Sequence, residues 1–132
     1  MIRGALAVVA GVLAGSVVVW VIDLPGNYLH PLPADLGPDY REALIAHAAS
    51  APLAAKSLFA AAWGVGPLVG GWLAARLAGR SRLTHSFIVG VIFLFMNVAT
   101  LLNFTLPFWL SVACLVLPPI TSFAGGLLAN RS

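Results

Sequence analysis

The polar residues that could do chemistry in this sequence lie inside long apolar stretches. Asn97 and Thr100 lie in one stretch, and Pro67 lies in another. A proline inside a helix lacks the N–H donor and frees the carbonyl of the residue four positions back. Such a carbonyl can bind a solute or accept a hydrogen bond from a neighbouring helix. The same combination of prolines and hydroxyl groups recurs near the end of the chain, at Pro118, Pro119, Thr121 and Ser122.

Two interpretations of these residues stay open. In the first, the prolines bend two helices so that they pack together. Asn97 then makes an interhelical hydrogen bond, because an amide that faces lipid would be costly. In the second, Pro67, Asn97 and Pro118 surround a solute or an ion in the middle of the apolar stretches. We prefer the first interpretation.

Histidines and acidic residues gather in one segment, 23–50, which raises the question of a metal site. The segment contains His30, His47 and all four acidic residues of the chain. Their spacing matches none of the compact ligand motifs, such as two histidines four residues apart on a helix, so we expect solvated side chains. The sequence also lacks a nucleophile–base pair and a phosphate-binding loop. We therefore expect no catalytic residue, no bound metal and no cofactor.

The composition predicts that most of the chain lies in lipid. Hydrophobic residues make up 61% of it and charged residues 8%, whereas about a quarter of the residues in soluble domains are charged. Four stretches, 4–22, 52–75, 83–102 and 106–129, reach the length of roughly 20 apolar residues that crosses a bilayer. We predict a single-domain, all-α membrane protein with an antiparallel bundle of four transmembrane helices. Membrane lipids are expected partners, and nucleic acid is not.

The charged residues predict which side of the membrane each connection faces. With four spans, both termini and the connection between the second and third spans lie on the same side. That side carries five arginines, and the other side carries Arg41 and Lys56. Because cytoplasmic connections are rich in Lys and Arg, we predict cytoplasmic termini in a bacterial inner membrane. Lys56, one turn inside the second span, is expected to extend its ammonium group to the outer interface.

The connection between the first two spans is predicted to contain a short helix. Its first half, from Asp23 to Pro38, is rich in Pro and Gly and is predicted to be an extended loop. In its second half, Asp39 and Glu42 have the spacing of a capping box. We expect this helix to lie on the extracytoplasmic surface of the membrane.

Each predicted span carries small residues four positions apart, a spacing that lets helix backbones approach closely. The second and fourth spans even end in nearly the same stretch, GGWLAAR at 70–76 and GGLLANR at 125–131. In a membrane, helix association depends on such close packing. The glycines expected to pack helices are Gly11, Gly15, Gly66, Gly70, Gly71, Gly90, Gly125 and Gly126.

These patterns resemble an uncharacterised family of small four-span bacterial integral membrane proteins. The likeness covers residues 29–129 and includes the Pro-Leu-Pro of 31–33, AAWGVGPLVGGWLAARLAGR (61–80), IVGVIFLF (88–95), NFTLPFW (103–109) and PPITSFAGGLLA (118–129). The resemblance implies the four-span architecture and carries over no catalytic or binding residue. The family's turn before the tryptophan resembles Pro-His-Pro, whereas this chain has Leu-Pro-Phe at 106–108, which argues against a histidine function there.

Two functions of different classes fit this sequence. The first is a packing or accessory subunit, without catalysis, that forms a homo-oligomer or joins a larger membrane complex. The reason for this hypothesis is the number of small-residue ridges, because a single four-helix bundle need not bury all of them. The second is a component of a small-solute or ion transporter or channel, with its site near Pro67, Asn97 and Pro118. A membrane enzyme that uses the outer segment is a third alternative.

Overall fold

The structure, a computed structural model, describes residues 1–35 and 37–131, and within them it is all-helical. Four of its helices are long and apolar enough to cross a membrane, and they overlap the four predicted spans, which confirms that part of the prediction. The short helix predicted between the first two spans is also present. The helices are α1 (Ile2–Leu29), α2 (Tyr40–Ala49), α3 (Leu53–Ala78), α4 (Arg82–Asn103) and α5 (Phe108–Arg131).

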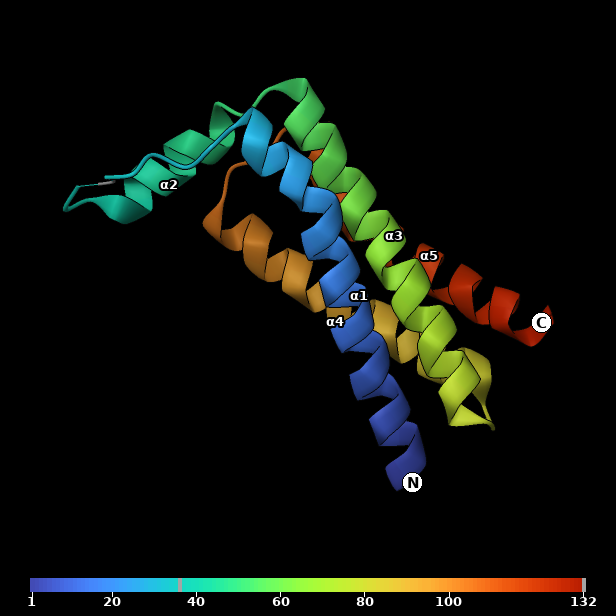
Figure 1. Ribbon diagram of the computed structural model, residues 1–132. Helices are drawn as coiled ribbons and strands as arrows, with labels where there is room; N and C mark the ends of the chain where they lie inside the picture. The colour runs from blue at the N-terminus through green and yellow to red at the C-terminus, as the bar shows by residue number, and fades with distance from the viewer. Residues whose placement is uncertain (36, 132) are drawn as a thin grey trace.

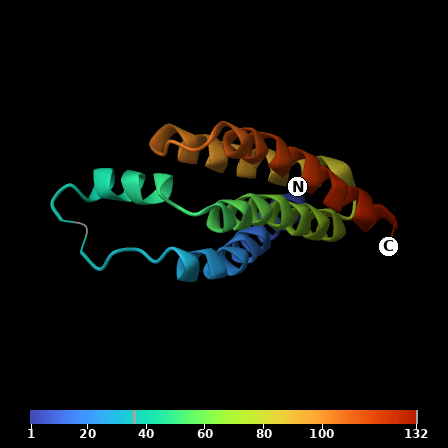
Figure 2. The ribbon, with the colours of Figure 1, turned by 90° about the horizontal axis from the view of Figure 1, so that it is seen from above.

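Helix α3 is the centre of the fold. It packs against α1, α4 and α5, whereas the contact between α1 and α4 is smaller. Figure 2 shows α3 as a middle layer, with α1 on one side and α4 and α5 on the other. The chain reverses direction from each long helix to the next, and α2 projects from the end at which α1 finishes (Figure 1).

Glycines bring the backbones of α1 and α3 into direct contact. A Cβ added to Gly11 would lie 2.5 Å from the carbonyl oxygen of Gly70, and a Cβ added to Gly15 would lie 2.7 Å from that of Gly66. The backbone of each helix therefore occupies the space that a side chain on the other would need. Ala74 adjoins this contact and is fully buried.

The two nearly identical stretches contribute adjacent glycines that contact different neighbours. Gly70 contacts α1, whereas Gly71 contacts α5. In the same way, Gly125 lies against the backbone of α3, and Gly126 lies against α4. Gly90 of α4 lies against the proline pair of α5. Each of the eight glycines predicted to pack helices thus lies at a contact between two helices of this one chain.

Helix α1 extends beyond the first predicted span, so the loop predicted from Asp23 begins only after Leu29. The helix continues through Pro25, which lacks the N–H that would bond the carbonyl of Val21. Five residues on, the backbone N–H of His30 bonds the carbonyl of Gly26 and closes the last turn. The loop prediction for 23–29 was wrong because a proline removes one hydrogen bond while the turns around it keep theirs.

The end of the molecule opposite α2 carries most of the basic residues. There the Nε of Arg3 donates to the carbonyl of Leu77, in the last turn of α3, at 2.9 Å. A cation is favourable at this position because the C-terminal end of a helix carries a partial negative charge. Helix α3 stops at Gly79, whose φ of 75° lies in the left-handed region that glycine adopts without strain.

We predict that Gly11→Ala lowers the free energy of unfolding by about 1–3 kcal/mol, because its methyl group would overlap the backbone of α3. The matched control is Gly64→Ala, whose Cβ would meet its nearest atom, on Leu117, at 3.7 Å. That control should leave stability unchanged or raise it by up to about 1 kcal/mol through helix propensity. Unfolding by SDS, followed by circular dichroism, measures both, and equal stability of the two variants would contradict the packing described.

Candidate functional site

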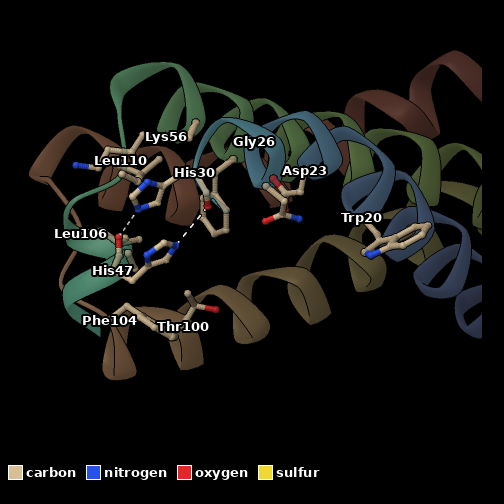
Figure 3. Close-up of a pocket in the computed structure, with 15 residues that line it drawn as sticks. Trp20, Asp23, Gly26, His30, His47, Lys56, Thr100, Phe104, Leu106 and Leu110 are labelled. Carbon is tan, nitrogen blue, oxygen red and sulfur yellow. Dashed lines mark hydrogen bonds between the residues drawn. The ribbon is translucent and has the colours of Figure 1, made fainter. Parts of the chain in front are cut away.

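A cavity of about 360 Å³, whose lining residues are drawn in Figure 3, lies at the α2 end of the molecule. Helix α1 contributes Trp20 and Asp23 to its wall, α3 contributes Lys56 and Phe59, and α4 contributes Thr100. Most of the wall is apolar, and a few polar groups converge on it. A concave, mostly apolar space with a few polar groups is typical of a small-molecule site.

His30 and His47 hold α2 against the end of α1. Their rings stack with centroids 3.9 Å apart and an interplanar angle of 14°. His30 Nε2 lies 2.8 Å from the carbonyl oxygen of His47, and His47 Nε2 lies 3.3 Å from that of His30. Because a carbonyl can only accept, each Nε2 carries a proton and donates it. Both residues are partly buried and lie side by side in Figure 3, so the expectation of two solvated side chains was wrong.

Two further hydrogen bonds connect α2 to the neighbouring ends of α3 and α4. Arg41 donates to the side-chain oxygen of Asn103, at the end of α4, at 3.0 Å. The ammonium group of Lys56 donates to the carbonyl of Ala49, at the end of α2, at 3.3 Å. The predicted capping box does not contribute, because the side chain of Asp39 makes no cap hydrogen bond. Side-chain hydrogen bonds to α3 and α4 and the His30–His47 pair thus hold α2 at one side of the cavity, to whose lining it contributes His47 and Ala48.

Asn97 lies fully buried one turn below the cavity and bonds α4 to α5. Its Nδ2 donates to the carbonyl oxygen of Cys114 at 2.7 Å. Cys114 lies four residues before Pro118, so this carbonyl is the one that the proline frees. Helices α3 and α5 continue through their prolines, and Pro67 and Pro118 are buried. The structure thus brings Asn97 to the carbonyl freed by Pro118 and uses both groups in a helix contact.

A pair of serines makes a second polar link between α4 and α5. The hydroxyl of Ser122 donates to the carbonyl of Ser86 at 2.6 Å, and the hydroxyl of Ser86 donates to the carbonyl of Ser122. Thr121 and Thr100 instead donate to the carbonyl four residues back in their own helices, at 2.8 Å and 3.1 Å. Of the polar side chains predicted from the sequence, Thr100 lines the cavity, and Asn97 and Ser122 lie in the α4–α5 contact.

Two buried polar atoms near the cavity lack a hydrogen-bond partner among the described residues. They are Nε1 of Trp63, a donor, and Oδ1 of Asn97, an acceptor. An unpaired buried polar atom costs about 1–3 kcal/mol. Phe59 of α3 and Thr100 of α4 both line the cavity. Trp63 lies one turn from Phe59, and Asn97 lies about one turn from Thr100. Both residues thus lie one helical turn from a lining residue, towards the middle of the bundle.

Sequence reasoning did not identify this cavity. Its lining comes from all five helices and their connections, so no single stretch contains the pattern. One signal was available in Asp23, an acidic residue that directly follows an apolar run containing Trp20. That pairing of a carboxylate with an aromatic ring at the end of a span indicates a polar site near the interface.

The long apolar helices of this chain are those of a small membrane protein. A comparison with known protein families, with curated proteins and with solved structures found no match to this chain. Its function is therefore inferred from the geometry of its own residues.

Proposed function

We propose that this chain is an integral membrane protein that binds a small solute in the cavity at the α2 end of the molecule, as the solute-binding component of a transporter. The observation that carries the proposal is the cavity itself. Its volume of about 360 Å³ falls within the range of about 300–1,000 Å³ that small-molecule sites occupy. The mostly apolar wall includes the polar side chains of Asp23, Asn27 and Thr100, which can fix the orientation of a bound molecule.

In this proposal α1, α3, α4 and α5 cross a bacterial inner membrane as an antiparallel bundle. Helix α2 lies at the extracytoplasmic surface, and both termini are cytoplasmic. The arginines at the end opposite α2 support this orientation. A helix of 28 residues, as α1 is, is about 42 Å long and exceeds the hydrocarbon thickness of roughly 30 Å. Its last turns, which include Asp23, therefore reach the headgroup region. We also propose that the chain belongs to the family of small four-span bacterial membrane proteins that its sequence resembles.

The inner half of the bundle restricts the direction from which a solute enters. Backbone contacts such as Gly11 with Gly70 fill the space between helices there. A solute would therefore reach the cavity from the outer side or from the outer leaflet. An open channel through a single chain finds no support in these contacts.

A second candidate function is a packing or accessory subunit that associates with itself or with a larger complex. The glycine ridges that suggested it are used within one chain, so a partner would contact larger apolar side chains instead. Helix α1 favours this candidate, because 22% of its most apolar stretch is buried, against 44% for α3. Leu6, Leu13 and Val17 lie on its exposed face.

We predict that Leu32→Cys, between α1 and α2, reacts with a membrane-impermeant maleimide in intact spheroplasts. Thr84→Cys, in the first turn of α4, should react only after the membrane is opened. Both positions are exposed in the structure, and Cys114 is buried, so the native thiol contributes little background. The reverse pattern of labelling would contradict the proposed orientation.

For the second candidate we predict that Leu13→Cys, on the exposed face of α1, forms a disulfide-linked dimer in oxidised native membranes. Phe95→Cys is the matched control, since it is similarly exposed but lies on α4. Dimers from α1 alone support self-association through that helix. If both variants remain monomeric, the hypothesis of self-association through α1 is contradicted.

For the cavity we predict that Ala51→Cys, at its wall, is alkylated by N-ethylmaleimide much faster than Cys114, which is 1% exposed. Saturating benzyl alcohol should slow the reaction of the introduced thiol. Adding Ala55→Phe, which fills the cavity, should abolish this protection. Ala61→Phe, on an exposed side of α3, should preserve it. A thiol at position 51 as slow as Cys114, or one that no solute protects, would contradict the proposed function.

A further inference from the structure

Asp23 lies in the wall of the cavity without a partner for its carboxylate. The residue is partly buried, and among the described residues its side chain makes no hydrogen bond and no ion pair. Figure 3 shows Asp23 between Trp20 and Gly26 on α1. A charged group that is partly removed from water is stabilised by an opposite charge beside it. An unpaired carboxylate in a mostly apolar cavity therefore favours a cation beside it.

Aromatic side chains line the same cavity. They are Trp20, Phe59 and Phe104. The face of an aromatic ring attracts a cation within about 6 Å of its centre, and tryptophan does so best. Trp20, which is 63% exposed, precedes Asp23 by three residues, so the two side chains start from one face of α1. A carboxylate and aromatic rings in an apolar wall together favour an organic cation over a hydrated inorganic one.

The basic residues of the cavity do not neutralise Asp23. Lys56 and Asp23 lie at different ends of the cavity in Figure 3, and the Lys56 ammonium group bonds the carbonyl of Ala49. His30 and His47 use their Nε2 protons on each other's carbonyl oxygens. The part of the cavity around Trp20 and Asp23 is thus left with an uncompensated negative charge.

We propose that this cavity binds a small organic cation, an ammonium group that carries an aromatic or aliphatic substituent, with Asp23 as its counter-ion. The inference rests on the proposed function, because it names the ligand class of the same cavity. The ammonium group can belong to a free solute or to the headgroup of a lipid such as phosphatidylethanolamine, and both present the same chemistry to Asp23.

The test is the binding of radiolabelled benzyltrimethylammonium to the full chain in phosphatidylglycerol nanodiscs, corrected with nanodiscs that lack protein. Saturable binding is expected. Asp23→Asn should weaken it about tenfold or more, as expected for the loss of a contact with a charged group. Asp23→Glu should retain binding. Asp39→Asn removes an exposed acid of the same outer segment and should leave the affinity unchanged. Circular dichroism and gel filtration check that each variant is folded.

Competition separates the ligand class from the existence of the site. The neutral isostere neopentylbenzene and the anion benzenesulfonate should not displace the label. The organic-cation inference would be overturned if neopentylbenzene and benzenesulfonate displaced the label as well as an organic cation does, and if Asp23→Asn bound the label with unchanged affinity. Protection of the thiol at position 51 by benzyl alcohol would then leave the proposed function standing. Absence of both label binding and protection would overturn both.

The lipid composition of the nanodisc separates the two sources of the ammonium group. Displacement of the label when phosphatidylethanolamine is included supports a lipid headgroup as the occupant. Unchanged binding supports a free solute. Either result supports the organic-cation inference only if binding of the label is still weakened by Asp23→Asn.

Discussion

Direct contact between helix backbones is the interaction on which this fold depends. In lipid, apolar side chains gain little by leaving their solvent, so helices associate through close packing and hydrogen bonds. Gly11 against Gly70 removes the side chains that would otherwise separate α1 from α3. Successive residues of a helix point about 100° apart, so Gly71 can contact α5 while Gly70 contacts α1. One pair of adjacent glycines therefore makes α3 the centre of the fold.

The prolines belong to the same packing scheme. A proline inside a membrane helix frees a carbonyl, and a neighbouring helix must satisfy it. Asn97 does so for the carbonyl of Cys114, which Pro118 frees. Below it, Ser86 and Ser122 exchange hydrogen bonds across the same pair of helices. The polar groups deep in the apolar helices thus bond α4 to α5, and the cavity lies one turn further out.

The number and type of the helices could be predicted from the sequence, because long apolar runs and small residues four apart are local patterns. The residue at which α1 ends could not be predicted, because the effect of Pro25 depends on whether the next turn keeps its hydrogen bonds. The pairing of His30 with His47 was also out of reach. These residues lie 17 positions apart, and their contact depends on how α2 folds back over α1. The capping box at Asp39 shows that even a matching local pattern need not form its hydrogen bond.

The change in side-chain size along the bundle explains why the cavity lies at the α2 end. Towards the other end, glycines hold α1 close to α3. Further out, α1 remains near α3, where a Cβ on Gly26 would lie 3.9 Å from Ala55, but bulky rings fill the space towards α4. Trp63 and Phe93 meet there edge to face with centroids 5.8 Å apart. Compressing such a layer would force side chains out of their preferred conformations, at about 1–3 kcal/mol each. The aromatic layer, in which Phe93 also packs against Gly15 of α1, therefore fills the space between α1, α3 and α4, and the cavity next to Asp23 lies beyond it, towards α2.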